Sequence, residues 1–195
     1  NQGNRTEPIY VLEVSDQSGN SLKSSQTQAT NIISPETAFL ISDVLQDVVR
    51  RGTGWRARVL GRPSAGKTGT TNDNLDAWYI GFIPQLLTGV YVGFDQPRSM
   101  GLHESGSRAA APIWVEFMKN AEANLPTQQF PQPPGIVSVK IHQSGRRAGP
   151  CDLQEEIREE HYKTGTEPQL DVMLNQNCPD QIMESDVTQD KEPEL

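Results

Sequence analysis

The alternation of apolar and polar residues in the first third of the chain predicts a strand followed by a helix. Residues 9–14 read as a strand that enters a glycine-containing turn at 16–20. Ser34-Pro35-Glu36 then provides an N-cap, a proline in the first turn and an acidic residue, so a helix is expected to begin there. Basic residues and Gly52 as C-cap are expected to end it. Its predicted apolar face consists of Ala38, Ile41, Leu45, Val48 and Val49.

The pattern changes to that of strands between residues 65 and 95. Two apolar segments, 75–83 and 86–94, are separated only by Pro84-Gln85. So short a link predicts two antiparallel neighbouring strands. Residues 77–94 form an uncharged run of 18 residues. The glycines and Pro84 within it fit two strands and a turn better than a membrane-spanning helix.

A second helix is predicted around Pro112, and we expect it to lie flat against the sheet. Four prolines between 126 and 134 mark a linker, and residues 136–141 are a candidate for one more short strand. The resulting fold class is α+β, an antiparallel sheet flanked by helices. The predicted apolar face of the second helix comprises Ile113, Trp114, Phe117, Met118, Ala121 and Leu125.

Charge divides the chain at about residue 150. The 195 residues carry a formal net charge of −8, yet residues 151–195 alone hold 13 acidic side chains against three basic ones. Because the remainder is nearly neutral, no nucleic-acid partner is expected. Few large aliphatic residues occur in the acidic part, which predicts a largely disordered tail. We therefore expect a folded portion at 1–125, a proline-rich linker at 126–150 and the tail at 151–195.

The two cysteines, Cys151 and Cys178, lie in this acidic part without metal-ligand spacing. A disulfide and two free thiols both remain open at this point. Neither a metal nor another cofactor is expected. Five arginines between residues 50 and 62 are expected to form a solvated basic surface.

One dense motif has two interpretations. The segment from Gly61 to Thr68 spells Gly-x-x-x-x-Gly-Lys-Thr, the phosphate-binding loop of nucleotide hydrolases. That loop requires a buried strand before it and a helix after it. Here residues 55–60 include two arginines and residues 69–74 are poor helix formers, so nucleotide binding is only a remote alternative.

The second interpretation places Lys67-Thr68-Gly69-Thr70 on a strand beside an active site. Lys67 supplies a fixed positive charge, and the hydroxyls of Thr68 and Thr70 can hold a carboxylate. Gly69 lets the backbone of a ligand approach closely. This is the Lys-Thr-Gly element of active-site serine acyltransferases.

Further landmarks surround that element in order. They are Gly52-Thr53-Gly54, Ala65-Gly66 before the lysine, Asp76-Ala77-Trp78-Tyr79-Ile80-Gly81-Phe82-Ile83-Pro84, Val90-Tyr91-Val92-Gly93-Phe94-Asp95 and Ala110-Ala111-Pro112-Ile113-Trp114. With them, roughly residues 1–135 resemble the C-terminal part of the transpeptidase domain of class A, bifunctional penicillin-binding proteins. Gly165-Thr166-Glu167-Pro168 resembles the same family more weakly.

The resemblance implies a peptidoglycan D,D-transpeptidase that binds stem peptides and is inhibited by β-lactams. It assigns catalytic roles to Lys67 and Thr70, the latter through an oxyanion-hole N–H, and substrate binding to Thr68, Gly69 and Thr70. It further implies a periplasmic location at the inner membrane and partners in cell-wall synthesis. The membrane anchor and the glycosyltransferase domain of such a protein would lie outside this chain.

Two elements of the family chemistry are missing from their expected places. The spelling Ser64-x-x-Lys67 overlaps the strand, whose alternation turns the two side chains to opposite faces, so Ser64 is not expected to be the nucleophile. Ser18-Gly19-Asn20 spells Ser-x-Asn but lies in a predicted turn. In the family both motifs precede the point where this chain begins. The chain alone is therefore expected to be inactive, and a non-catalytic peptide-binding module or scaffold is the alternative.

Overall fold

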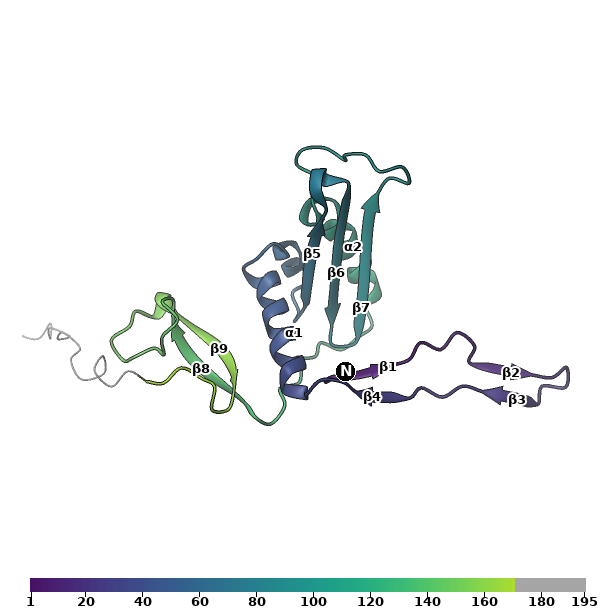
Figure 1. The fold of residues 1–195 in the computed structure, drawn as a ribbon, viewed down its shortest axis with the longest axis horizontal. Coiled ribbons are helices and arrows are strands. Elements are labelled where there is room, and N and C mark those ends of the chain that lie inside the picture. Colours follow the sequence, from purple (N-terminus) through teal and green to yellow (C-terminus); the bar gives the residue numbers. More distant parts are fainter. Residues whose placement is uncertain (171–195) are drawn as a thin grey trace, which may run out of the picture. The chain divides into compact units, whose positions relative to one another are not determined.

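The computed structural model describes residues 1–170 (Figure 1). The chain divides into two units, the first spanning Asn1–Gly135 and the second beginning at Ile136. The α+β class predicted from the sequence is confirmed, because the structure consists of antiparallel sheets together with helices.

The core of the first unit is a three-stranded antiparallel sheet. Its strands are β5 (Ala65–Thr70), β6 (Asp76–Ile83) and β7 (Leu86–Gly93), in the order β5-β6-β7. The turn at Pro84-Gln85 joins β6 to β7 as the sequence predicts. Because β6 is central, its side chains alternate strictly: Tyr79 is buried while Trp78 is 43% exposed on the other face.

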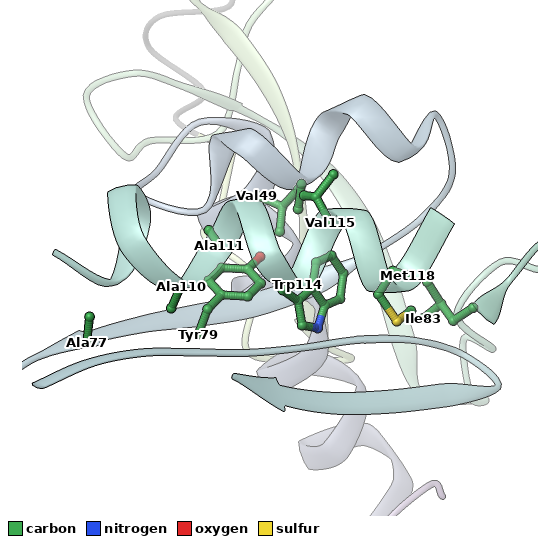
Figure 2. Close-up of a cluster of buried hydrophobic side chains, with 10 residues drawn as sticks. Val49, Ala77, Tyr79, Ile83, Ala110, Ala111, Trp114, Val115 and Met118 are labelled. Atoms are coloured by element: carbon green, nitrogen blue, oxygen red, sulfur yellow. The ribbon is translucent and has the colours of Figure 1, made fainter. Parts of the chain in front are cut away.

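Helix α2 (Ala111–Ala121) covers the buried face of this sheet. Figure 2 shows Trp114 and Met118 reaching from α2 towards Tyr79 and Ile83 of the sheet. The ring of Trp114 packs edge-on against Tyr79, with centroids 5.1 Å apart. Its indole N–H is shared between the carbonyl oxygens of Gly81 (3.3 Å) and Thr88 (3.1 Å).

The face of α2 that the sequence predicts is only partly correct. Ile113 and Phe117 are 52% and 51% exposed, although both were expected in the core. The buried stripe instead runs through Ala111, Trp114, Val115 and Met118. Gly81 explains the orientation, since a β-carbon there would lie 2.7 Å from the indole ring of Trp114. Space for one large side chain therefore sets the rotation of the helix.

Helix α1 (Pro35–Arg50) begins as predicted, with the hydroxyl of Ser34 accepting the N–H of Thr37 at 3.2 Å. Its C-cap is Arg51, one residue before the expected Gly52. The predicted apolar face is wrong for Ile41, which is 57% exposed. Two polar side chains of this helix, Asp43 and Gln46, are buried. Arg50 donates to Gln46 at 2.9 Å and lies 3.7 Å from Asp43.

The N-terminal residues form an antiparallel ribbon of four short, exposed strands: β1 (Asn4–Thr6), β2 (Glu13–Ser15), β3 (Ser21–Ser24) and β4 (Ala29–Asn31). Strand β1 pairs with β4, and β2 pairs with β3. The strand expected at 9–14 begins only at Glu13, and Pro8 lacks the N–H that pairing nearer the N-terminus requires. Ser18-Gly19-Asn20 is the predicted turn, held by Asp16, whose carboxylate accepts the N–H of Ser18 at 2.8 Å.

The segment before β5 contradicts the nucleotide-binding alternative. Residues Trp55–Leu60 form a 3-10 helix instead of a strand. Strand β5 begins within the motif, at Ala65, and continues to Thr70, where a phosphate-binding loop would lead into a helix. Arg62 also differs from expectation, since its side chain is only 6% exposed. It pairs with Glu122 at 3.5 Å and donates to the carbonyl of Pro126 at 2.7 Å, which ties the start of β5 to the end of α2.

The second unit contains an antiparallel pair, β8 (Ile136–His142) and β9 (Ile157–Lys163). Strand β8 confirms the short strand expected in the linker. The expectation of a largely disordered tail from residue 151 is wrong for residues 157–163. These residues form β9, which pairs with β8, a strand that precedes the acidic segment. Residues 171–195, also included in that expectation, lie outside the described part. Cys151 is disulfide-bonded; the chain's other cysteine, Cys178, is outside the described residues as well.

Asp152 should make the second unit sensitive to acid. Its carboxylate accepts a 2.7 Å hydrogen bond from Arg146 and another from the N–H of Gly149 at 2.8 Å. These bonds, that of Arg146 foremost, lower the pKa of Asp152 to about 2. A lowered pKa in the folded state adds stability above the unfolded value of 3.8, and that contribution is lost as the pH falls towards 2.

We therefore expect Asp152→Asn to lower the melting temperature of the second unit at pH 7, with a difference from wild type that narrows between pH 4 and pH 2. Amide hydrogen exchange in β8 and β9, measured across this range, checks the prediction. Glu155→Gln, which removes an exposed carboxylate and leaves this ion pair intact, is the matched control. A difference for Asp152→Asn that stayed constant down to pH 2 would contradict the assignment.

Within residues 1–170, no helix combines the length and the apolar character needed to cross a membrane.

Candidate functional site

Strand β5 is an edge strand, and its geometry defines the candidate site. Among the described strands it pairs only with β6. The N–H of Thr71 donates to the carbonyl of Asp76 at 3.1 Å, which fixes the phase of the ladder. Because hydrogen-bonded and non-hydrogen-bonded pairs alternate in an antiparallel ladder, the N–H groups of Thr68 and Thr70 point away from β6. Two backbone donors thus face the open edge.

Lys67 and Thr68 place further polar groups at this edge. The ammonium of Lys67 is exposed and donates to the carbonyl oxygen of Thr68 at 2.8 Å. The hydroxyl of Thr68 lies 2.8 Å from the hydroxyl of Thr53, which follows helix α1. Helix α1 packs against β5, so residues 15 positions apart in the chain meet at one point.

Thr70 is held by a segment that follows β7 in the chain. Its hydroxyl oxygen accepts the backbone N–H of Gly106 at 3.0 Å. Gly106 begins the short π-helix Gly106–Ala110 and packs against the backbone of β5 and β6. A β-carbon at this position would be 2.3 Å from the carbonyl oxygen of Trp78 and 2.6 Å from that of Gly69. The accepting hydroxyl of Thr70 still has its own proton to donate.

Two tyrosines lie on the neighbouring strands, Tyr79 on β6 and Tyr91 on β7. Burial raises the pKa of Tyr79, which pairs with Thr68 across the ladder, to about 12, so its phenol stays neutral and is unsuited to act as a base. Tyr91 donates to the carboxylate of Asp76 at 2.8 Å, and this hydrogen bond raises the pKa of Tyr91. Asp76 in turn donates its N–H to the hydroxyl of Thr71 at 2.8 Å. These bonds close the end of the sheet next to Thr70.

Ser64 is excluded as a nucleophile within the described structure. Its side chain is 5% exposed, and its hydroxyl oxygen is inaccessible to solvent and finds no hydrogen-bond partner in residues 1–170. The strand also starts at Ala65, so Ser64 and Lys67 are not on one helical face.

The structure brings all four residues of the predicted Lys-Thr-Gly-Thr element to one edge and adds two that sequence reasoning did not select, Thr53 and Gly106. A signal existed for Thr53, because Gly52-Thr53-Gly54 was among the landmarks of the resemblance. The sequence contains no such signal for Gly106, because it and its neighbours Ser105 and Ser107 match no motif. In residues 1–170 no cluster of three or more His, Cys, Asp or Glu side chains could hold a metal ion.

Chemically, the edge combines one cation, two outward backbone N–H groups and hydroxyl donors. Such a set binds a carboxylate and stabilises negative charge that develops on a carbonyl oxygen. The group lies along a single strand, so a ligand with an extended backbone can pair with it while its carboxylate meets the hydroxyls.

This fold and site define a class. The chain belongs to the family of penicillin-binding protein transpeptidase domains, which matches residues 1–119. Three of the proteins that it resembles are each named penicillin-binding protein 1A. Penicillin-binding protein 1A of Aquifex aeolicus is 41% identical over 143 residues, covering 73% of this chain and 20% of that protein. Penicillin-binding protein 1A of Pseudomonas aeruginosa is 47% identical over 126 residues, covering 64% of this chain and 15% of that protein.

The solved structures agree. Penicillin-binding protein 1A from Haemophilus influenzae superimposes with a TM-score of 0.76 at 30% identity, over 86% of this chain and 30% of that one. The resemblance to a fragment of a class A penicillin-binding protein is therefore confirmed. The chain spans about a fifth or less of the length of the curated relatives named here.

Proposed function

We propose that this chain supplies the Lys-Thr-Gly edge of a peptidoglycan D,D-transpeptidase of the serine acyltransferase type. The observation that carries the proposal is the open edge of β5, where Lys67, Thr68 and Thr70 present a cation, hydroxyls and outward N–H groups together. Stem peptides are the substrates of this function and β-lactams are its inhibitors.

Each residue of the edge has a distinct role. Lys67 provides the positive charge and takes part in relaying a proton. The hydroxyl of Thr68 binds the carboxylate of the stem peptide, and Gly69 allows the peptide backbone to approach. The backbone N–H of Thr70 stabilises the oxyanion that forms when a serine attacks the peptide carbonyl.

The attacking serine, with its lysine base, comes from sequence upstream of Asn1. Acyl transfer needs the nucleophile, the base and the oxyanion hole in one assembly. In the longer protein, these parts would act at the periplasmic face of the inner membrane, beside a glycosyltransferase domain and other cell-wall proteins. No cofactor takes part in this chemistry.

Labelling with a fluorescent penicillin tests the proposal. We expect the full-length protein to become stably labelled, and the 195-residue chain alone to remain unlabelled. Lys67→Ala in the full-length protein should slow labelling by about 10²-fold, the scale of losing one electrostatic contact to the transition state. The matched control is Lys140→Ala, an exposed lysine of β8 that should label like wild type.

Two outcomes contradict the proposal. Stable labelling of the isolated chain would show that the chain holds its own nucleophile. Absence of labelling in the full-length protein would favour the alternative, a non-catalytic peptide-binding module or scaffold. In that case N-acyl-D-alanyl-D-alanine would still shift the amide resonances of Thr68 and Thr70, because the edge would be intact.

A further inference from the structure

Thr53 lies against the hydroxyl that the proposed function uses to hold the substrate carboxylate. The two threonine hydroxyls, Thr53 and Thr68, are 2.8 Å apart and form a hydrogen bond in which either can donate. A hydroxyl has one proton and can accept twice. The direction of this single bond therefore decides whether the proton of Thr68 remains available for a ligand.

The backbone around Thr53 is fixed on both sides. The N–H groups of Gly52 and Gly54 both donate to the carbonyl of Val48, at 3.1 and 2.9 Å. Gly54 is buried, and a β-carbon there would lie 3.2 Å from the phenol oxygen of Tyr79. These contacts anchor the turn after α1 to the core, so the fold sets the position of the Thr53 backbone.

We infer that Thr53 is a positioning residue for the carboxylate site: it donates its proton to the oxygen of Thr68, which turns the proton of Thr68 towards the bound anion. A carboxylate at the β5 edge favours this direction, because it can only accept. Successive donation from Thr53 to Thr68 to the carboxylate also polarises each bond and strengthens the last one. The inference rests on the proposed function, and it adds a residue from a different element to the site.

The experiment compares the second-order acylation rate of the full-length protein by benzylpenicillin and by its methyl ester, which lacks the carboxylate. Thr53→Val keeps the shape of the side chain and removes the donor. We expect it to slow acylation by benzylpenicillin about tenfold while leaving the rate with the ester within about twofold of wild type. Thr53→Ser, which restores the hydroxyl, should recover most of the loss.

Thr30→Val is the matched control, since Thr30 is also an exposed threonine but lies on β4 in the N-terminal ribbon. It should leave both rates unchanged. Circular dichroism and the melting temperature should be the same for all variants, because Thr53 is exposed.

The results separate the possible failures. An equal loss with both ligands would mean that Thr53 acts on the general structure of the site, and no loss with either would mean that Thr68 is oriented without it; each overturns the inference while the proposed function stands. A wild-type protein that neither ligand acylates overturns the proposed function and, with it, the inference.

Discussion

Trp114→Ala is expected to lower the free energy of unfolding of the first unit by about 4 kcal/mol, because it empties the centre of the core. The indole is fully buried between α2 and the sheet and packs against Tyr79. Its removal leaves a cavity and also takes away the donor shared by the carbonyls of Gly81 and Thr88. Urea unfolding of the chain, followed by circular dichroism at 222 nm, measures the change.

Phe117→Ala is the matched control on the same helix. The sequence predicts both aromatic residues on the apolar face, but Phe117 is 51% exposed. Its truncation should cost less than about 1 kcal/mol, since only part of its surface leaves water on folding. Similar losses for the two variants would contradict the orientation of α2 shown in Figure 2.

Gly106→Ala is expected to disturb the site most strongly among single-methyl substitutions. The new β-carbon would lie 2.3 Å from the carbonyl oxygen of Trp78 and 2.6 Å from that of Gly69, both of which are backbone atoms that cannot rotate away. The loop must therefore move and release its hydrogen bond to Thr70. We expect a loss of about 2 kcal/mol in stability from the steric strain.

The same variant should slow labelling of the full-length protein by penicillin about 10²-fold, the effect of shifting a reacting group by about 1 Å. Gly89→Ala is the matched control, because its β-carbon would make only an ordinary contact, 3.7 Å from the side chain of Ile80. That variant should retain both stability and labelling. Wild-type labelling by Gly106→Ala would show that the loop does not position Thr70.

The sequence determined the local features of this protein. Ser34 and Pro35 start a helix through their own capping chemistry, and Pro84-Gln85 forces a tight link between two apolar strands. These signals act within a few residues, so they are readable without a partner. The ordered Lys67-Thr68-Gly69 element and its surrounding landmarks also identified the family, as the match over residues 1–119 confirms.

Tertiary structure alone decided which helix faces are buried and what surrounds the threonines. Ile41 and Phe117 satisfy the helical spacing but remain exposed, because burial depends on the elements that pack against each helix. The space at Gly81 for the indole of Trp114 shows this for α2. Strand β9 likewise depends on β8, a partner outside the acidic segment whose composition suggested disorder.

Thr53 and Gly106 reach the β5 edge from positions 15 and 36 residues away from their partners. Contacts of that kind arise from packing between elements, so no local pattern encodes them. The sequence by itself therefore determined the family and the strand that carries Lys67, whereas the fold decided how the hydroxyls of Thr68 and Thr70 are held.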